Sequence, residues 1–131
     1  MFVDASAVIA IIAGEDDAAS LAARLARAKS SYVSPIVIYE AVAGLARKRA
    51  CPIAEADELV RQFVAETGAQ SIDITDQIGR EAVKAFDRFG RARHKADLNM
   101  GDCFAYACAR THRLELLFKG NDFTETDIPV A

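Results

Sequence analysis

Short apolar segments that alternate with longer segments of helical periodicity constrain the fold of this chain more than any other feature. A strand buried on both faces of a parallel sheet is a nearly continuous apolar run, and strands separated by helices predict an α/β fold. We therefore predict a mainly parallel central sheet of four to five short strands flanked by helices. The expected strands cover residues 1–4, 32–34, 71–74, 114–118 and 128–130.

Helix start and stop signals lie between these strands. Ser6 is a good N-cap for the first helix, and Thr75 can cap the fifth. Pro35 suits the first turn of the third helix, and Gly68 can end the fourth. The predicted helices span residues 5–13, 18–28, 35–49, 54–67, 76–89 and 101–111.

Composition narrows the class of protein. The 131 residues, 52% of them hydrophobic, suffice for one core, so we expect a single domain over residues 1–131. No apolar run approaches the roughly 20 residues that span a bilayer, and Asp4 lies where a secretory signal would carry basic residues, so we expect a cytoplasmic protein. Three cysteines without a CxxC pair argue against a disulfide framework or a structural zinc site. The net charge of −3 means that any contact with nucleic acid must be local.

Four acidic residues lie among apolar or small neighbours, whereas acids on a solvated surface usually have polar company. They are Asp4, Glu40, Asp102 and Asp122. Asp4 ends the first predicted strand and Asp122 follows the fourth, so both belong at the edge where parallel α/β sheets bind ligands. Glu40 lies within the apolar helix segment 36–43. An ionised carboxylate there would be costly without compensation.

A divalent cation is the simplest compensation for clustered carboxylates. Mg²⁺ or Mn²⁺ prefers oxygen ligands, so the four acids are candidate metal-binding and catalytic residues. Ordinary structural roles stay open beside this one. Asp4 and Asp102 each precede a helix and could be caps, Asp122 could be a turn residue, and Glu40 could be the buried partner of an arginine.

Four ordered segments extend over nearly the whole chain: VDASA at residues 3–7, the helix that carries Glu40, LNMGDCFAYA at 98–107 and LFKGNDF at 117–123. Through them the sequence resembles the PIN-domain family, and specifically the VapC-type toxins of prokaryotic toxin–antitoxin pairs. The last two segments are much more specific than the DxS of the first. The resemblance assigns the family's acidic positions to the four acids named above. Ser6 matches a small hydroxyl position near the site, and Asn99 an Asn that often precedes Gly-Asp, although a capping role fits Asn99 equally well.

The resemblance implies an endoribonuclease that uses Mg²⁺ or Mn²⁺ and cleaves structured RNA such as tRNA or rRNA. The ion would lower the pKa of a bound water and align it for attack on a phosphodiester. The resemblance also implies a homodimer that a VapB-like antitoxin inhibits, within a larger complex that binds operator DNA through the antitoxin.

A basic loop precedes the helix of Asp102. Arg91, Arg93 and Lys95 have no helix end to stabilise, so they are candidate RNA-binding residues, with a plain solvated loop as the alternative. Related toxins often have Pro in place of Lys95 and a small residue in place of Asp97, which leaves the substrate-facing loop less certain than the acidic positions.

Other functions compete with this interpretation. A receiver-like phospho-acceptor domain has similar alternation and a lysine after a late strand, which Lys119 could supply, but it would make Asp73 central and leave Glu40 unexplained. A haloacid-dehalogenase-type phosphatase needs a DxDx[TV] run, and the segment after Asp4 lacks the second aspartate. A non-catalytic binding module is the third alternative.

Overall fold

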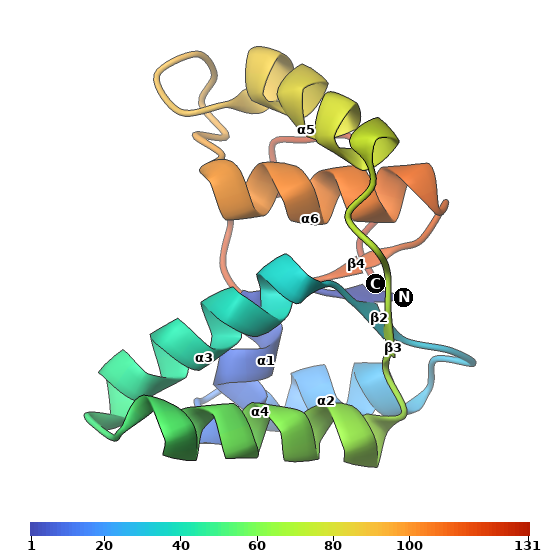
Figure 1. Ribbon diagram of the computed structural model, residues 1–131. Coiled ribbons are helices and arrows are strands. Elements are labelled where there is room, and N and C mark those ends of the chain that lie inside the picture. Colours follow the sequence, from blue (N-terminus) through green and yellow to red (C-terminus); the bar gives the residue numbers. More distant parts are fainter.

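A parallel four-stranded sheet lies at the centre of the computed structural model, which describes all residues from 1 to 131 (Figure 1). The strand order is β3-β2-β1-β4, and Phe2 of β1 pairs with Tyr32 on one side and Leu116 on the other. The predicted α/β fold with a mainly parallel sheet is therefore confirmed. The strands are β1 (Phe2–Val3), β2 (Tyr32–Val33), β3 (Gln70–Ser71) and β4 (Leu116–Leu117).

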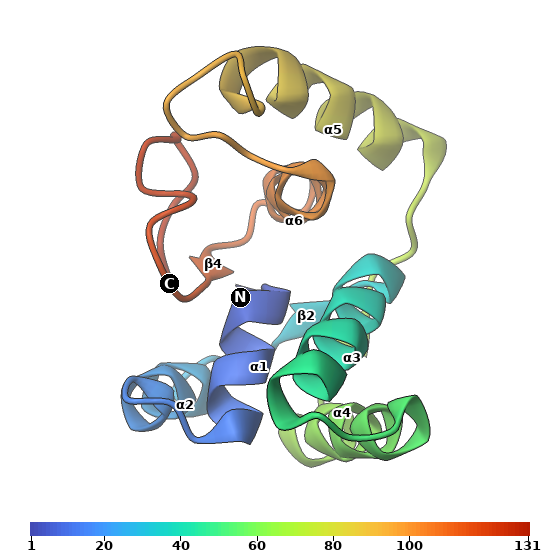
Figure 2. The ribbon, with the colours of Figure 1, turned by 90° about the vertical axis from the view of Figure 1, so that its left-hand side faces the viewer.

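Six helices cover the two faces of this sheet. The first four lie on one face and the last two on the other (Figure 1). In Figure 2, α6 is seen end-on, with α1 and α3 below it. The chain moves outward from β1 to β3 and then returns to place β4 on the other side of β1, so the strand order switches between β1 and β4. The helices are α1 (Ala5–Ala13), α2 (Ala18–Ala26), α3 (Pro35–Arg49), α4 (Ile53–Thr67), α5 (Asp76–Phe89) and α6 (Met100–Thr111).

Local chemistry at the helix ends agrees with most of the predicted boundaries. The hydroxyl of Thr75 accepts a hydrogen bond from the backbone N–H of Ile78 at 3.2 Å and caps α5. Gly68 ends α4 with a left-handed φ of 68°. The prediction that Ser6 caps α1 is wrong. Asp4 is the N-cap, because its carboxylate accepts the N–H of Ser6.

The third and the last predicted strands do not lie as predicted, and the other three are shorter than predicted. The third is β3, at residues 70–71 rather than 71–74: the N–H of Ile72 still donates to the carbonyl of Val33 at 2.8 Å, but the chain then leaves the sheet towards α5. The last segment, 128–130, makes only an isolated bridge between Val130 and Leu116. Two backbone hydrogen bonds with Leu116 hold the segment, at 2.9 and 3.0 Å, and its apolar pattern reflects packing of Ile128 against the core.

The core surrounds the short central strands. Phe2, Val3, Leu116 and Leu117 are each fully buried, and truncating Phe2 to alanine would cost about 3–5 kcal/mol of stability. No helix in the structure combines the length and the apolar character needed to cross a membrane. All three cysteines are unpaired.

Candidate active site

Asp4 lies at the carboxyl end of β1, at the point where the strand order switches. Its side chain is buried, and Oδ2 accepts hydrogen bonds from the N–H of Ser6 at 3.1 Å and from the Ser6 hydroxyl at 2.6 Å. The Ser6 oxygen in turn accepts the backbone N–H of Lys119, just after β4, at 3.0 Å. Ser6 therefore ties the Asp4 carboxylate to the loop after β4 and fixes its direction.

Asp102 lies in the first turn of α6, in a reciprocal capping arrangement with Asn99. The N–H of Asn99 donates to Oδ2 of Asp102 at 3.1 Å, and the N–H of Asp102 donates to Oδ1 of Asn99 at 2.9 Å. Asn99 thus has the capping role that the sequence left open. One Asp102 oxygen is engaged in the cap, and its other oxygen accepts no hydrogen bond from protein.

Glu40 reaches the same place from the second turn of α3. Its carboxylate lies directly against the backbone of Gly101, and a methyl group on Gly101 would overlap it. Gly101 therefore belongs to the site, although its place in the LNMGDCFAYA segment assigned it no role of its own. The available signal was a glycine inside the first turn of a helix, where it costs about 1 kcal/mol relative to alanine and has no capping role.

Burial and mutual repulsion destabilise the charged forms of these three carboxylates. Burial raises the pKa of Glu40 to about 7, and the charges of Asp4 and Asp102 add to the effect. Burial also raises the pKa of Asp102 to about 7, against the opposing hydrogen bond from Asn99, with the charges of Asp4 and Asp122 adding to the rise. Burial raises the pKa of Asp4, while the hydrogen bonds from Ser6 oppose the shift. The acids predicted from the sequence therefore lie within electrostatic range of one another.

Asp122 completes the set from the loop after β4. It is exposed and accepts no side-chain hydrogen bond, yet its charge contributes to the raised pKa of both Asp4 and Asp102. None of the ion pairs in the structure involves any of the four acids, so no arginine neutralises Glu40.

The donor set fits a hard divalent cation, but the side chains do not form a closed metal cage. As they lie, no three Asp, Glu, His or Cys residues converge closely enough to hold an ion. Mg²⁺ usually keeps several waters and binds one or two carboxylates, so a closed cage is not required. The Glu40 carboxylate, which packs where a Cβ atom of residue 101 would lie, forms no ion pair, and neither do the other three acids; both observations fit an ion held partly through its waters.

Comparison with known proteins identifies the family. The sequence matches the PIN domain over residues 1–129. The chain belongs to the PIN-domain family. A VapC ribonuclease of Rhizobium meliloti (strain 1021) is 42% identical over 139 aligned positions, which cover 97% of this chain and 98% of that protein. Ribonuclease VapC36 of Mycobacterium tuberculosis is 37% identical over 129 positions, 98% of this chain and 91% of that protein. The predicted relationship to VapC-type proteins is confirmed.

Solved structures support the same fold for this PIN domain. Mycobacterium tuberculosis VapC20, a sarcin-ricin loop cleaving toxin, superposes with a TM-score of 0.78 at 18% identity, covering 99% of this chain and 97% of that one. A chain of a toxin–antitoxin complex from Klebsiella pneumoniae gives a TM-score of 0.71 at 23% identity, covering 99% and 95%.

The basic loop of the PIN domain is exposed, and each of its predicted RNA-binding cations lies near an acid. Arg91 lies 3.9 Å from Asp97, Arg93 lies 3.2 Å from Asp87, and Lys95 lies 3.0 Å from Glu125. Exposed pairs of this kind contribute about 0–1 kcal/mol, so a phosphate can replace the acid. Of the three cations, Arg91 is the one whose charge opposes the raised pKa of Asp102.

Two acids outside the candidate active site have specific partners. Asp127 accepts hydrogen bonds from the Tyr106 hydroxyl at 2.6 Å and from Arg88 at 3.3 Å. Asp17 lies 3.2 Å from the ammonium of Lys119. No sequence pattern indicated either interaction, because each joins residues that are distant in the chain.

The structure also bears on the receiver-like alternative. Asp73 is exposed and follows β3, which is the edge strand of the sheet. A phospho-acceptor would have to lie centrally, beside the acids that follow β1 and β4. The family assignment and this position together argue against a receiver.

Proposed function

We propose that this PIN domain is a metal-dependent endoribonuclease and the toxin of a toxin–antitoxin pair. The observation that carries the proposal is the convergence of Asp4, Glu40 and Asp102, none of which forms an ion pair. Burial raises the pKa of all three carboxyls, and the charges of neighbouring acids add to each rise. Keeping such carboxylates ionised requires a compensating ligand. The ribonuclease names of relatives that are 37–42% identical over nearly the whole chain support RNA as the substrate.

Each acid has a defined part in this proposal. Asp4, Glu40, Asp102 and Asp122 would hold Mg²⁺ or Mn²⁺, directly or through its waters. Such an ion supplies a bound water of lowered pKa and offsets the charge of the scissile phosphate. Ser6 orients the Asp4 carboxylate, and Asn99 orients that of Asp102.

The basic loop would supply the local positive charge that an acidic protein needs to bind RNA. Arg91, Arg93 and Lys95 would contact phosphates, each releasing its acid partner. Structured RNA such as tRNA or rRNA is the proposed target class. Replacing all three with alanine should reduce the slope of log affinity against log salt, by up to about 0.7 for each phosphate of a single strand that is no longer bound.

The proposed partner is a VapB-like antitoxin, supported by the likeness to a chain of a toxin–antitoxin complex. A cluster of carboxylates that binds cations also accepts a guanidinium or ammonium group, so an antitoxin side chain of this kind would compete with the metal. Equal Mn²⁺ affinity with and without antitoxin would show that inhibition blocks RNA access instead. We also propose a homodimer, which would bind operator DNA only through its antitoxin.

The direct test is RNA cleavage by the purified protein with Mg²⁺, with Mn²⁺ and after treatment with a chelator. We expect cleavage only with a divalent ion and loss of cleavage in Asp102→Asn. Asp73→Asn is the matched control, because it removes an exposed carboxylate at the edge strand and should cleave like the wild type. Undiminished cleavage after chelation, or by Asp102→Asn, would contradict the proposal.

A further inference from the structure

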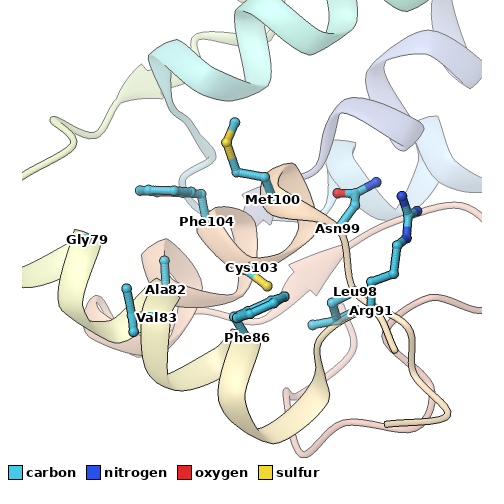
Figure 3. A pocket seen from close by; sticks show the side chains of 10 residues that line it. All are labelled: Gly79, Ala82, Val83, Phe86, Arg91, Leu98, Asn99, Met100, Cys103 and Phe104. Atoms are coloured by element: carbon cyan, nitrogen blue, oxygen red, sulfur yellow. The ribbon is translucent and has the colours of Figure 1, made fainter. Parts of the chain in front are cut away.

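A mainly apolar pocket of about 410 Å³ lies between α5 and α6 (Figure 3). Its lining includes Asn99, Met100 and Cys103, which flank Asp102 in the sequence. A molecule in this pocket would therefore lie beside the first turn of α6, the turn that also carries Asp102. The volume falls within the range of about 300–1,000 Å³ that is usual for small-ligand sites.

The apolar part of the lining is unusually accessible. Val83, Phe86 and Met100 keep 67%, 47% and 69% of their surface exposed. These three are half of the six large apolar side chains that the whole molecule exposes, and all three line this one pocket. Exposed apolar groups gathered in a concave site indicate a binding function.

Hydrogen-bond donors mark one end of the pocket. Arg91 and Asn99 lie at that end, and Gly79 lies at the other (Figure 3). Asn99 uses only its amide oxygen in the cap of α6, which leaves both amide N–H donors for a ligand. The guanidinium of Arg91 lies 3.9 Å from Asp97, beyond hydrogen-bond length, so its donors are also available. The occupant should combine an apolar face with acceptor oxygens or a negative charge.

We propose that this pocket is a nucleobase subsite, which holds one unstacked base of the RNA beside the cleaved phosphodiester. A base presents an apolar face to Phe86 and Met100, while its carbonyl oxygens and the adjacent phosphate accept hydrogen bonds from Asn99 and Arg91. A second copy of the chain fits less well, because a stable interface buries about 800 Å² on each partner and only three large apolar side chains are exposed here. The subsite rests on the proposed ribonuclease activity and adds base selection to it.

Gly79 offers a way to fill the pocket without disturbing the fold. A Cβ atom at this helical position would meet nothing within 4 Å, and its backbone needs no left-handed φ. Gly79→Leu should therefore place an apolar side chain in the space for the base. Gly79→Ala is the matched control, because it gives the same type of helix-favouring change without filling the pocket.

The experiment measures kcat/KM with Mn²⁺ on a short single-stranded RNA that the wild-type protein selects from a random-sequence pool. The same RNA is then tested with each base near the cleaved bond removed in turn. We expect one abasic position to reduce wild-type kcat/KM by about tenfold, the size of one base-stacking interaction. On the intact RNA, Gly79→Leu should have a kcat/KM about tenfold below that of the wild type. On that abasic RNA, the variant and the wild type should have the same kcat/KM, because both changes remove the same interaction. Gly79→Ala should match the wild type.

Several results would overturn the subsite. Gly79→Leu could cleave intact RNA at the wild-type rate, or its effect could add fully to that of every abasic position. Gly79→Leu could instead lose dimer formation in light scattering, or lose antitoxin binding, while RNA cleavage is unchanged, which would assign the pocket to a protein partner. If the wild-type protein with Mg²⁺ or Mn²⁺ cleaves neither the pool nor structured tRNA and rRNA, the proposed ribonuclease activity fails, and the subsite with it.

Discussion

Two groups of carboxylates with opposite pKa shifts lie along helix α6. At its N-terminal end, Asp102 lies with Asp4 and Glu40, and burial and repulsion raise the pKa of all three. Towards its C-terminal end, the Tyr106 hydroxyl donates to Asp127, and this bond, with that from Arg88, holds the pKa of Asp127 below its ordinary value. In the first region the ionised carboxylates have no cationic side chain paired with them, and in the second the carboxylate is compensated by the protein's own side chains.

This contrast separates a functional cluster from a structural one without reference to the family. Uncompensated buried charge destabilises a protein, so it persists where a ligand or a reaction requires it. The Asp127 cluster fastens the C-terminal segment to α5 and α6 and needs nothing further. Removing one charge should therefore have opposite consequences in the two regions.

The largest expected effect is on catalysis. Glu40→Gln should reduce kcat/KM for RNA cleavage by about a thousandfold or more, because it removes one of the charges that hold the metal. The same change should raise the melting temperature of the metal-free protein, since it relieves repulsion with Asp4 and Asp102. Cleavage kinetics and thermal unfolding measure the two effects.

Asp127→Asn is the matched control in the second region. It should lower stability by about 1 kcal/mol, since it weakens charged hydrogen bonds to a half-exposed carboxylate, and should leave kcat/KM near the wild-type value. If Asp127→Asn loses as much activity as Glu40→Gln, the two regions do not divide function from structure.

The next effect is on the free energy of unfolding, which a divalent metal should raise more at high pH than at low pH. Because the pKa of Glu40 and of Asp102 is about 7 in the folded protein, the folded state keeps protons that the unfolded chain has already released. The protonated carboxyls of Glu40 and Asp102 thus stabilise the fold at low pH, and this stabilisation is lost as pH rises between about pH 4.5 and 7. Mn²⁺ should restore it above pH 7, by about 2.7 kcal/mol at a hundred times its Kd. Denaturant titrations with and without Mn²⁺ would measure this, and equal stabilisation at pH 5 and pH 8 would argue against metal binding at these acids.

Much of the fold and of the candidate site could be predicted from the sequence, but the contacts between side chains could not. The apolar context of Glu40 predicted a compensated carboxylate, and the ends of the first and fourth strands placed Asp4 and Asp122 at one edge. Two details could not be predicted. The contact between Gly101 and the Glu40 carboxylate depends on how α3 crosses α6. The hydrogen bond between Tyr106 and Asp127 depends on the path of an irregular loop. Periodicity describes which face of an element is buried, and carries no information about such crossings.

A smaller effect should follow from changing the space beside Glu40. Gly101→Ala adds a methyl group that overlaps the Glu40 carboxylate, so the carboxylate must move. Overpacking of this kind costs about 1–3 kcal/mol, against a gain of about 1 kcal/mol in helix propensity. We expect weaker Mn²⁺ binding in isothermal titration with the fold retained. Wild-type metal affinity in Gly101→Ala would show that the position of Glu40 is unimportant for the ion.

The smallest effect tests the compensated region. Tyr106→Phe removes a buried hydroxyl that donates to Asp127 and should lower stability by about 1 kcal/mol at neutral pH. Because the pKa of Asp127 is lowered in the folded protein, this contribution is present above the ordinary pKa of an aspartic acid and is lost as pH falls through the folded value. The difference in unfolding free energy between Tyr106→Phe and the wild type should therefore shrink in acid, whereas the Glu40 region gains stability there. If the difference instead grows as pH falls, the Tyr106 hydroxyl does not stabilise the charged form of Asp127, and the contrast between the two ends of α6 fails.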